Sequence, residues 1–303
     1  VKELKEQVKT LFDLLMESAE KHQNVLLPGY THLQIAMPSS FGMWFSAYAE
    51  TLIDDITMLN AAFKIVDQNP LGSAAGYGSS FPINRTFTTK ELGFETLKFN
   101  SVAAQMSRGK SEKTVAFAMS SVAATLAKFS MDVCLYMSQN FDFISLPSHL
   151  TTGSSIMPHK KNPDVFELIR GKCNKIQALP YEITLITNNL PSGYHRDFQL
   201  LKEGLFPAIQ NLKACLDIAI FAIKDIKVKD NILADKKYDY LFTVDTLNEM
   251  VVAGIPFRDA YKAVAEQLEN GTFVSPKETK HTHEGSINNL CLEEIKQKMK
   301  SAF

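Results

Sequence analysis

The chain has 303 residues, in which 32 Lys and Arg nearly balance 33 Asp and Glu. This length suffices for one large domain plus a smaller one, with a substantial core. The balanced charge, without basic clusters interleaved with aromatic residues, argues against nucleic acid and anionic membranes as partners.

The N-terminal stretch, residues 1–18, is amphipathic and contains acids, so it resembles neither a signal peptide nor a transit peptide. Four cysteines lie far apart in the sequence, with neither a CxxC pair nor a zinc-ligand spacing: Cys134, Cys173, Cys215 and Cys291. We therefore expect reduced core thiols in a cytoplasmic protein, with no metal and no other cofactor.

A first polar cluster, LLPGYTHLQIAMPSSFGMW, occupies residues 26–44 between two helical stretches. His32 follows a Pro-Gly turn and lies between Thr31 and Gln34, so we expect it near a helix end or in a loop. Two interpretations are open: a structural histidine, or a general acid or base held at the boundary of an element.

Three stretches carry apolar residues at alternating steps of four and three, which predicts long helices packed nearly parallel in a bundle. These stretches are residues 45–66, 115–136 and 205–226. The middle stretch carries further apolar residues off the seam, so a helix over residues 111–140 is expected to be buried on every side. At about 1.5 Å per residue it would be roughly 45 Å long, which predicts the core of an oligomer.

A membrane span is the alternative for this middle stretch. Lys113, Lys128 and Asp132 interrupt any apolar run of spanning length, so we do not expect one.

The second polar cluster, TTGSSIMPHKKNPDVFELIR, occupies residues 151–170 and changes abruptly into a helical pattern. Asn162 is expected as the N-cap and Pro163 as the first helical residue. The N–H groups of a helix start, together with the two preceding lysines, favour an anion. The alternative is an ordinary turn with a solvated lysine edge, and this cluster alone specifies no reaction.

The third polar cluster is NNLPSGYHRDFQLLKEGLF, residues 188–206. Six polar side chains crowd one junction between loop and helix: Tyr194, His195, Arg196, Asp197, Gln199 and Lys202. A charged helix start is the alternative interpretation. Each of the three clusters is expected at an end of a long helix.

Beyond residues 230–237 the seam pattern gives way to a charged linker and shorter amphipathic segments, with a Gly-Ile-Pro turn at residues 254–256. We predict an all-α protein in two domains. Residues 1–234 would form a long-helix bundle that carries the loop 151–163, and residues 235–303 a small helical domain.

GSSIMPHKKNP, residues 153–163, resembles the signature of the fumarase/aspartase superfamily, whose members release fumarate from succinyl-type substrates. With PGYTHLQ (28–34), YHRDFQLLKE (194–203) and GIPFRDAY (254–261), the chain is most similar to the argininosuccinate lyase family over essentially its whole length. The resemblance implies a cytoplasmic homotetramer of long-helix bundles, with active sites shared between subunits. Val1 matches a point just beyond a further N-terminal segment of the family, which carries a Ser-Arg-Asn-Asp motif, and we expect this chain to lack that segment.

The implied reaction is an anti β-elimination that splits argininosuccinate into arginine and fumarate. Ser154 would be the base, and Lys160 would stabilise the developing negative charge. His32 would protonate the departing nitrogen, with Glu167 orienting it. The implied substrate-binding residues are Thr31, Ser155, Asn162, Tyr194, Arg196, Gln199 and Lys202.

The chain departs from the family pattern in the residues expected around the amine half of the substrate. His195 replaces an Asn, and Leu200 and Leu201 replace two acids. His159 replaces the usual Gln, as it does in many adenylosuccinate lyases. A sister lyase acting on another succinyl-amine such as adenylosuccinate, and a non-catalytic crystallin-like relative, are therefore the alternatives.

Overall fold

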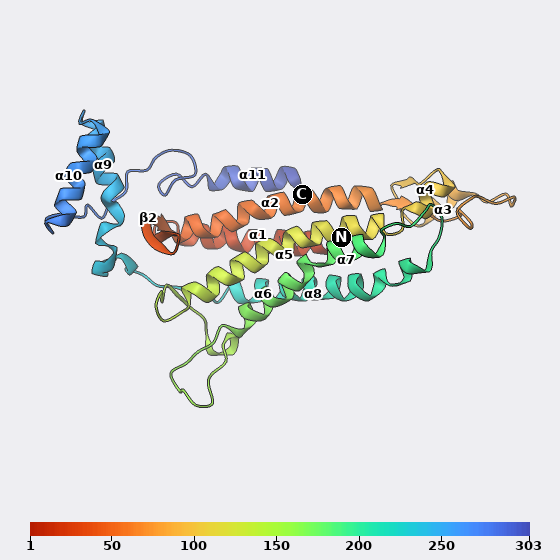
Figure 1. Cartoon of the computed structure of the whole chain (residues 1–303), viewed down its shortest axis with the longest axis horizontal. Helices are drawn as coiled ribbons and strands as arrows, with labels where there is room; N and C mark the ends of the chain where they lie inside the picture. The colour runs from red at the N-terminus through yellow and green to blue at the C-terminus, as the bar shows by residue number, and fades with distance from the viewer.

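The computed structural model describes residues 1–303. Long helices lie side by side in an elongated bundle (Figure 1), which confirms the predicted all-α bundle. The helices are α1 (Lys2–Lys21), α2 (Phe41–Val66), α3 (Arg85–Glu91), α4 (Ser101–Met106), α5 (Lys110–Tyr136), α6 (Asp164–Gln177), α7 (Leu179–Ile186), α8 (Leu201–Ile223), α9 (Thr243–Val252), α10 (Phe257–Glu269) and α11 (Leu292–Ala302).

Short strands and 3₁₀ helices punctuate the bundle. The strands pair in twos: β1 (Leu26–Thr31) with β2 (Gln34–Ser40), β3 (Gln68–Asn69) with β4 (Thr96–Leu97), and β5 (Ile144–Ser145) with β6 (Lys227–Val228). The 3₁₀ helices are η1 (Ser148–Leu150), η2 (Arg196–Gln199), η3 (Ile232–Ala234) and η4 (Lys236–Phe242).

One continuous hydrophobic core holds α1, α2, α5, α6 and α8 together. The seams read from the sequence form its centre, because Leu52, Leu126 and Leu216 are each at most 1% exposed. All four cysteines are free thiols, and Cys173 and Cys215 are buried in this core.

Helix α5 is the expected middle helix, but it begins one residue earlier and ends at Tyr136 rather than at residue 140. Its 27 residues give a length of about 40 Å. The single chain alone does not bury α5 on every side, because Phe117 and Met131 are 51% and 45% exposed. These side chains lie on a face of α5 that the rest of this chain does not cover.

A partly buried polar contact ties α5 to α2. One carboxylate oxygen of Asp132 accepts hydrogen bonds from Trp44 Nε1 at 3.0 Å and from the Tyr48 hydroxyl at 2.6 Å. Burial first, and then this hydrogen bond, raise the pKa of Tyr48, so its hydroxyl stays a donor. Asp132, which in the sequence only interrupts an apolar run, is therefore an internal acceptor of the bundle.

The first polar cluster is a β-hairpin, which the helical interpretation of the sequence did not predict. Thr31 pairs with Gln34, so His32 and Leu33 are the two residues of the turn. Both have left-handed backbone angles, with φ of 54° and 59°. Positive φ at both central residues is the pattern of a type I′ turn, which matches the twist of the flanking strands.

Beyond the bundle, α9 and α10 pack on each other around a small second cluster of Leu247, Ala260 and Val264. They stand apart from the long helices in Figure 1. Helix α11 then returns to the bundle and packs on α1 and α2 through the buried Ile295 and Met299. The proposed domain boundary after residue 234 stays a prediction.

Two segments, Lys110–Tyr136 and Arg196–Ile223, are long and apolar enough to cross a membrane by length and composition alone. Core helices of soluble proteins pass the same test, and 56% and 39% of the residues in the two apolar windows are buried inside this chain. The test is therefore weak evidence for a membrane span.

Candidate active site

The second polar cluster folds into a loop with a closed neck. Thr152 and Asn162 exchange two backbone hydrogen bonds, Thr152 N to Asn162 O at 3.2 Å and Asn162 N to Thr152 O at 2.8 Å. The Thr152 hydroxyl also donates to the Asp164 carboxylate. Residues 153–161 therefore project from a fixed base, and they form the lobe below the bundle in Figure 1.

Inside this loop the Ser154 oxygen is surrounded by backbone donors. It accepts hydrogen bonds from the N–H groups of Ile156 at 3.2 Å and Met157 at 3.0 Å. Hydrogen bonds to an oxygen favour its negatively charged form. The geometry thus suits a serine that gives up its proton.

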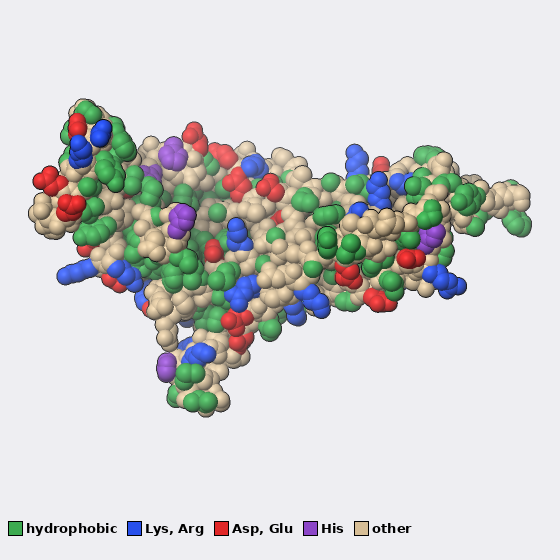
Figure 2. Space-filling view, in the orientation of Figure 1, with side chains coloured by type: hydrophobic (Ala, Val, Ile, Leu, Met, Phe, Trp, Pro, Cys, Tyr) green, Lys and Arg blue, Asp and Glu red, His purple; other side chains and the backbone are tan.

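The rest of the loop is solvent-exposed, including Ser155, Lys160 and Lys161. Ile156 is 85% exposed at the tip. Figure 2 shows apolar, cationic and histidine side chains together on this lobe. In the single chain, then, the loop presents positive charge and an apolar tip that nothing covers.

The expected N-cap was wrong by one residue. Helix α6 begins at Asp164 with Pro163 in the capping position, and no side chain caps it. Asn162 is instead held by its backbone in the neck of the loop. Glu167 is exposed in the first turn of α6.

The hairpin that carries Thr31 and His32 is anchored through Tyr30. The Tyr30 ring packs on Phe141 with centroids 5.1 Å apart, and its hydroxyl lies 3.4 Å from the hydroxyl of Tyr238 on η4. Thr31 and His32 themselves are exposed at the turn. The imidazole of His32 is therefore exposed to solvent on a hairpin that is anchored by the contacts of Tyr30.

The third cluster lies where α8 begins, at the opposite end of the bundle. Gln199 Nε2 donates to the Tyr194 hydroxyl at 3.0 Å, and His195 Nε2 lies 3.1 Å from the Pro191 carbonyl oxygen. Arg196 and Lys202 are exposed. Of the two leucines that replace acids, Leu201 is buried at 1% exposure, whereas Leu200 is 49% exposed.

Within one chain the third cluster does not meet the other two. The hairpin contacts the segments that follow the C-terminal ends of α5 and α8, whereas the third cluster contacts Arg108 just before α5 begins. His32 and Glu167 share no hydrogen bond or ion pair, so the expected pairing is absent from the single chain. Figure 1 shows the hairpin and the signature loop toward one end and the start of α8 toward the other.

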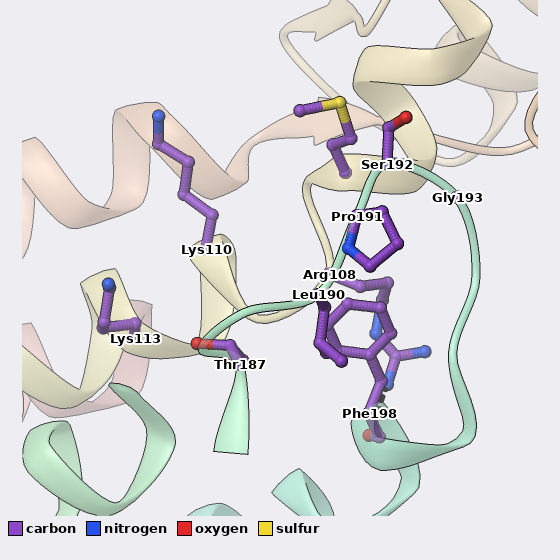
Figure 3. A pocket seen from close by; sticks show the side chains of 10 residues that line it. Arg108, Lys110, Lys113, Thr187, Leu190, Pro191, Ser192, Gly193 and Phe198 are labelled. Atoms are coloured by element: carbon purple, nitrogen blue, oxygen red, sulfur yellow. Dashed lines mark hydrogen bonds between the residues drawn. The ribbon is translucent and has the colours of Figure 1, made fainter. Parts of the chain in front are cut away.

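A cavity beside the third cluster involves residues that the sequence interpretation did not select. It has a volume of about 320 Å³, and Arg108, Lys110 and Lys113 contribute to its lining (Figure 3). The signal was the basic run SRGKSEK at residues 107–113, where α5 begins. No group of three or more His, Cys, Asp or Glu side chains is placed to hold a metal ion.

Comparison of the fold finds similar solved structures. An EDDS lyase in complex with formate superposes with a TM-score of 0.80 at 19% identity, covering 99% of this chain and 68% of that one. A class II fumarase from Schistosoma mansoni gives a TM-score of 0.75 at 19% identity, covering 99% and 66%. At such identities the likeness concerns the fold alone.

Sequence comparison goes further. The model of a lyase family matches residues 1–178. The argininosuccinate lyase of Parabacteroides distasonis is 58% identical over 303 residues, covering 100% of this chain and 68% of that protein. That of Bacteroides fragilis is 58% identical over 295 residues, covering 97% and 66%.

The argininosuccinate lyase of Xanthomonas campestris is 41% identical over 250 residues, covering 82% of this chain and 58% of that protein. The chain thus spans about two thirds of the length of the first two relatives and less of the third. Identity of this level across the whole chain confirms the resemblance seen in the polar clusters, and the chain belongs to the argininosuccinate lyase family.

Proposed function

We propose that the protein splits argininosuccinate into arginine and fumarate by breaking a carbon–nitrogen bond. The observation that carries the proposal is the 58% identity to an argininosuccinate lyase over all 303 residues, which includes all three polar clusters. The departures at Leu200 and Leu201 concern the amine half of the substrate, and they leave the fumarate half of the chemistry intact.

In the proposed mechanism, Ser154 removes a proton from the carbon next to a substrate carboxylate. An alcohol is a weak base, so its alkoxide form needs stabilisation, and the N–H groups of Ile156 and Met157 supply it. Lys160 and Asn162 then bind the carboxylate that takes up the negative charge of the carbanion.

The second half of the reaction releases the amine. The carbon–nitrogen bond breaks as the electron pair forms the double bond of fumarate, and His32 gives its proton to the departing nitrogen. Glu167 orients His32, Thr31 and Ser155 bind the fumarate half, and the third cluster binds the rest of the substrate through Tyr194, Arg196, Gln199 and Lys202.

We further propose a cytoplasmic homotetramer in which each site combines clusters from different subunits. The separation of the clusters along α5 supports this, since about 40 Å of helix lies between the two ends. The exposed apolar residues Phe117, Phe206 and Phe221 on the long helices supply surface for such packing. No cofactor, nucleic acid or membrane is part of the proposal.

Release of fumarate, followed by its ultraviolet absorbance, tests the reaction. We expect release from argininosuccinate and none from adenylosuccinate. Release from adenylosuccinate alone would make the protein a sister lyase, and release from neither would contradict the proposed activity.

Mixing two inactive variants tests the sharing of sites. Ser154→Ala and Tyr194→Ala should each be inactive alone. If Ser154 and Tyr194 of one site come from different subunits, an unfolded and refolded 1:1 mixture carries both native residues in about a quarter of its sites. Activity near that fraction is expected, and a mixture as inactive as its components would contradict shared sites.

A further inference from the structure

The cavity next to the third cluster is lined by cations and by no carboxylate. It is formed by the start of α5 and by the segment that leads into η2. Its ten lining residues are Met106, Arg108, Lys110, Lys113, Thr187, Leu190, Pro191, Ser192, Gly193 and Phe198. Figure 3 shows Lys110 and Lys113 on the start of α5 and Pro191, Ser192 and Gly193 on the neighbouring segment.

Glu112, which lies between Lys110 and Lys113 in sequence, already has a partner for each of its carboxylate oxygens. Glu112 accepts from Arg108 Nε at 3.0 Å with one oxygen and from the backbone N–H of Gly109 at 2.7 Å with the other. Arg108 is thereby largely neutralised, and it also donates to the Phe198 carbonyl at 3.1 Å. Lys110 and Lys113 form no ion pair and no side-chain hydrogen bond. Two positive charges without an ion-pair partner in this chain therefore lie at the start of α5, three residues apart, and both side chains contribute to the lining of the cavity.

Beside the cavity, the backbone at the start of α5 lies in close contact with the residue that follows α7. Gly109 has a φ of 80°, and a Cβ atom on it would lie 2.5 Å from Thr187 Cγ2. Only glycine lets the start of α5 contact the end of α7 in this way. The two lysines are thus held next to the 187–193 segment by the fold itself.

The cavity is continuous with the third cluster. Gly193 lines it and directly precedes Tyr194, and the Phe198 ring lines it while lying 6.4 Å from the Tyr194 ring. A ligand whose centre contacts Tyr194 and Gln199 can therefore place its far end in the cavity. An anionic end would be favoured there, because Lys110 and Lys113 line the cavity and have no ion-pair partner in this chain.

We propose that Lys110 and Lys113 bind the α-carboxylate of the amine half of the substrate. This inference rests on the proposed function, in which that half is an arginine. The carboxylate is the one anionic group of arginine, and it lies at the end of the molecule remote from the bond that breaks. The two lysines are then specificity-determining residues that take no part in the elimination.

The proposed contact can be tested from both sides, by removing the carboxylate from the ligand or the lysines from the protein. L-Arginine and agmatine share the guanidinium and the alkyl chain, but agmatine lacks the carboxylate. Equilibrium binding of both is measured by calorimetry to the full chain and to the double variant Lys110→Gln, Lys113→Gln. We expect the unmodified protein to bind arginine about tenfold more tightly than agmatine, from two solvent-accessible ion pairs. The double variant should lose this preference.

Two controls separate the proposal from a general effect of charge or folding. Lys128→Gln removes an exposed charge elsewhere on α5 and should keep the preference. The double replacement by arginine, Lys110→Arg with Lys113→Arg, should restore it, because the positive charges remain.

Kinetics distinguish failure of this inference from failure of the proposed function. The double glutamine variant should show a KM for argininosuccinate about tenfold higher, with kcat within about twofold, because the lost contact is the same in ground and transition states. An unmodified protein that releases no fumarate contradicts the proposed function. Normal release combined with an unchanged KM, or an arginine preference that survives in the double glutamine variant, overturns only the carboxylate site.

Discussion

Removing the Asp132 carboxylate should destabilise the bundle strongly, because two buried donors depend on one of its oxygens. Trp44 and Tyr48 are 7% and 8% exposed, so neither can turn to water when Asp132 is replaced by alanine. Each hydrogen bond to a charged acceptor contributes about 1.5–3 kcal/mol. Asp132 is only half-buried, so we take the lower part of this range and expect Asp132→Ala to lose about 3–4 kcal/mol of unfolding free energy.

Asp132→Asn is the matched control. Its side-chain oxygen can still accept both hydrogen bonds, although without the negative charge, so we expect a loss of about 1–2 kcal/mol. The asparagine variant loses only the charge, whereas the alanine variant also loses the acceptor oxygen and the side-chain volume.

Urea unfolding measures both variants, and the protein supplies its own probe. Trp44 is the single tryptophan of the chain, so its fluorescence reports directly on the environment that Asp132 maintains. Protein concentrations must be equal, because association shifts apparent stability. An alanine variant as stable as the asparagine variant would show that the two donors find other partners, and would refute this reasoning.

Three further changes probe the loop, the core and the start of α5. Ser154→Ala should abolish fumarate release while the melting temperature stays within about 2 °C, since an exposed-loop hydroxyl adds little to stability; normal turnover would exclude Ser154 as the base. Asp55 is 1% exposed, and burial raises the pKa of its carboxyl group. The native state therefore holds this proton more tightly than the unfolded state, and the free energy of unfolding falls as pH rises from about 4 through the raised pKa. Asp55→Asn should therefore raise the melting temperature at pH 8 but not at pH 4, and an equal effect at both would contradict a titrating Asp55. Gly109→Ala should cost about 2–3 kcal/mol of unfolding free energy in urea, from positive φ plus the contact with Thr187, whereas Gly171→Ala, with open space around it, should cost none.

The long helices could be predicted from sequence because their signal is local and repeated. Seven apolar residues at helical spacing define each seam, and burial at Leu126 and Leu216 agrees with that pattern. The hairpin at residues 26–40 escaped prediction because its turn has neither glycine nor asparagine. His32 and Leu33 adopt positive φ there, which side chains with a Cβ rarely do without support from flanking strands.

The residues of the candidate site could be proposed from the sequence, but their arrangement in space could not. The Ser154 contacts and the Thr152–Asn162 neck depend on turns that no periodicity encodes. The cationic cavity likewise needs Gly109 against Thr187, a contact between segments 78 residues apart in sequence. Contacts of this kind depend on how the helices pack, and a single sequence does not contain that information.

The distance between clusters follows from simple helix geometry. The second cluster ends at Pro163 and the third begins near Asn188, so only a short stretch of sequence separates them. That stretch is α6 and α7, 14 and 8 residues of helix running along the bundle, or about 33 Å. Neighbouring clusters in sequence therefore lie at opposite ends of the chain in space. A second copy running antiparallel would set the Tyr194 end of one chain beside the His32 and Ser154 end of the other. In that arrangement the substrate would reach from the proposed carboxylate site at Lys110 and Lys113 of one subunit to Ser154 and His32 of the other.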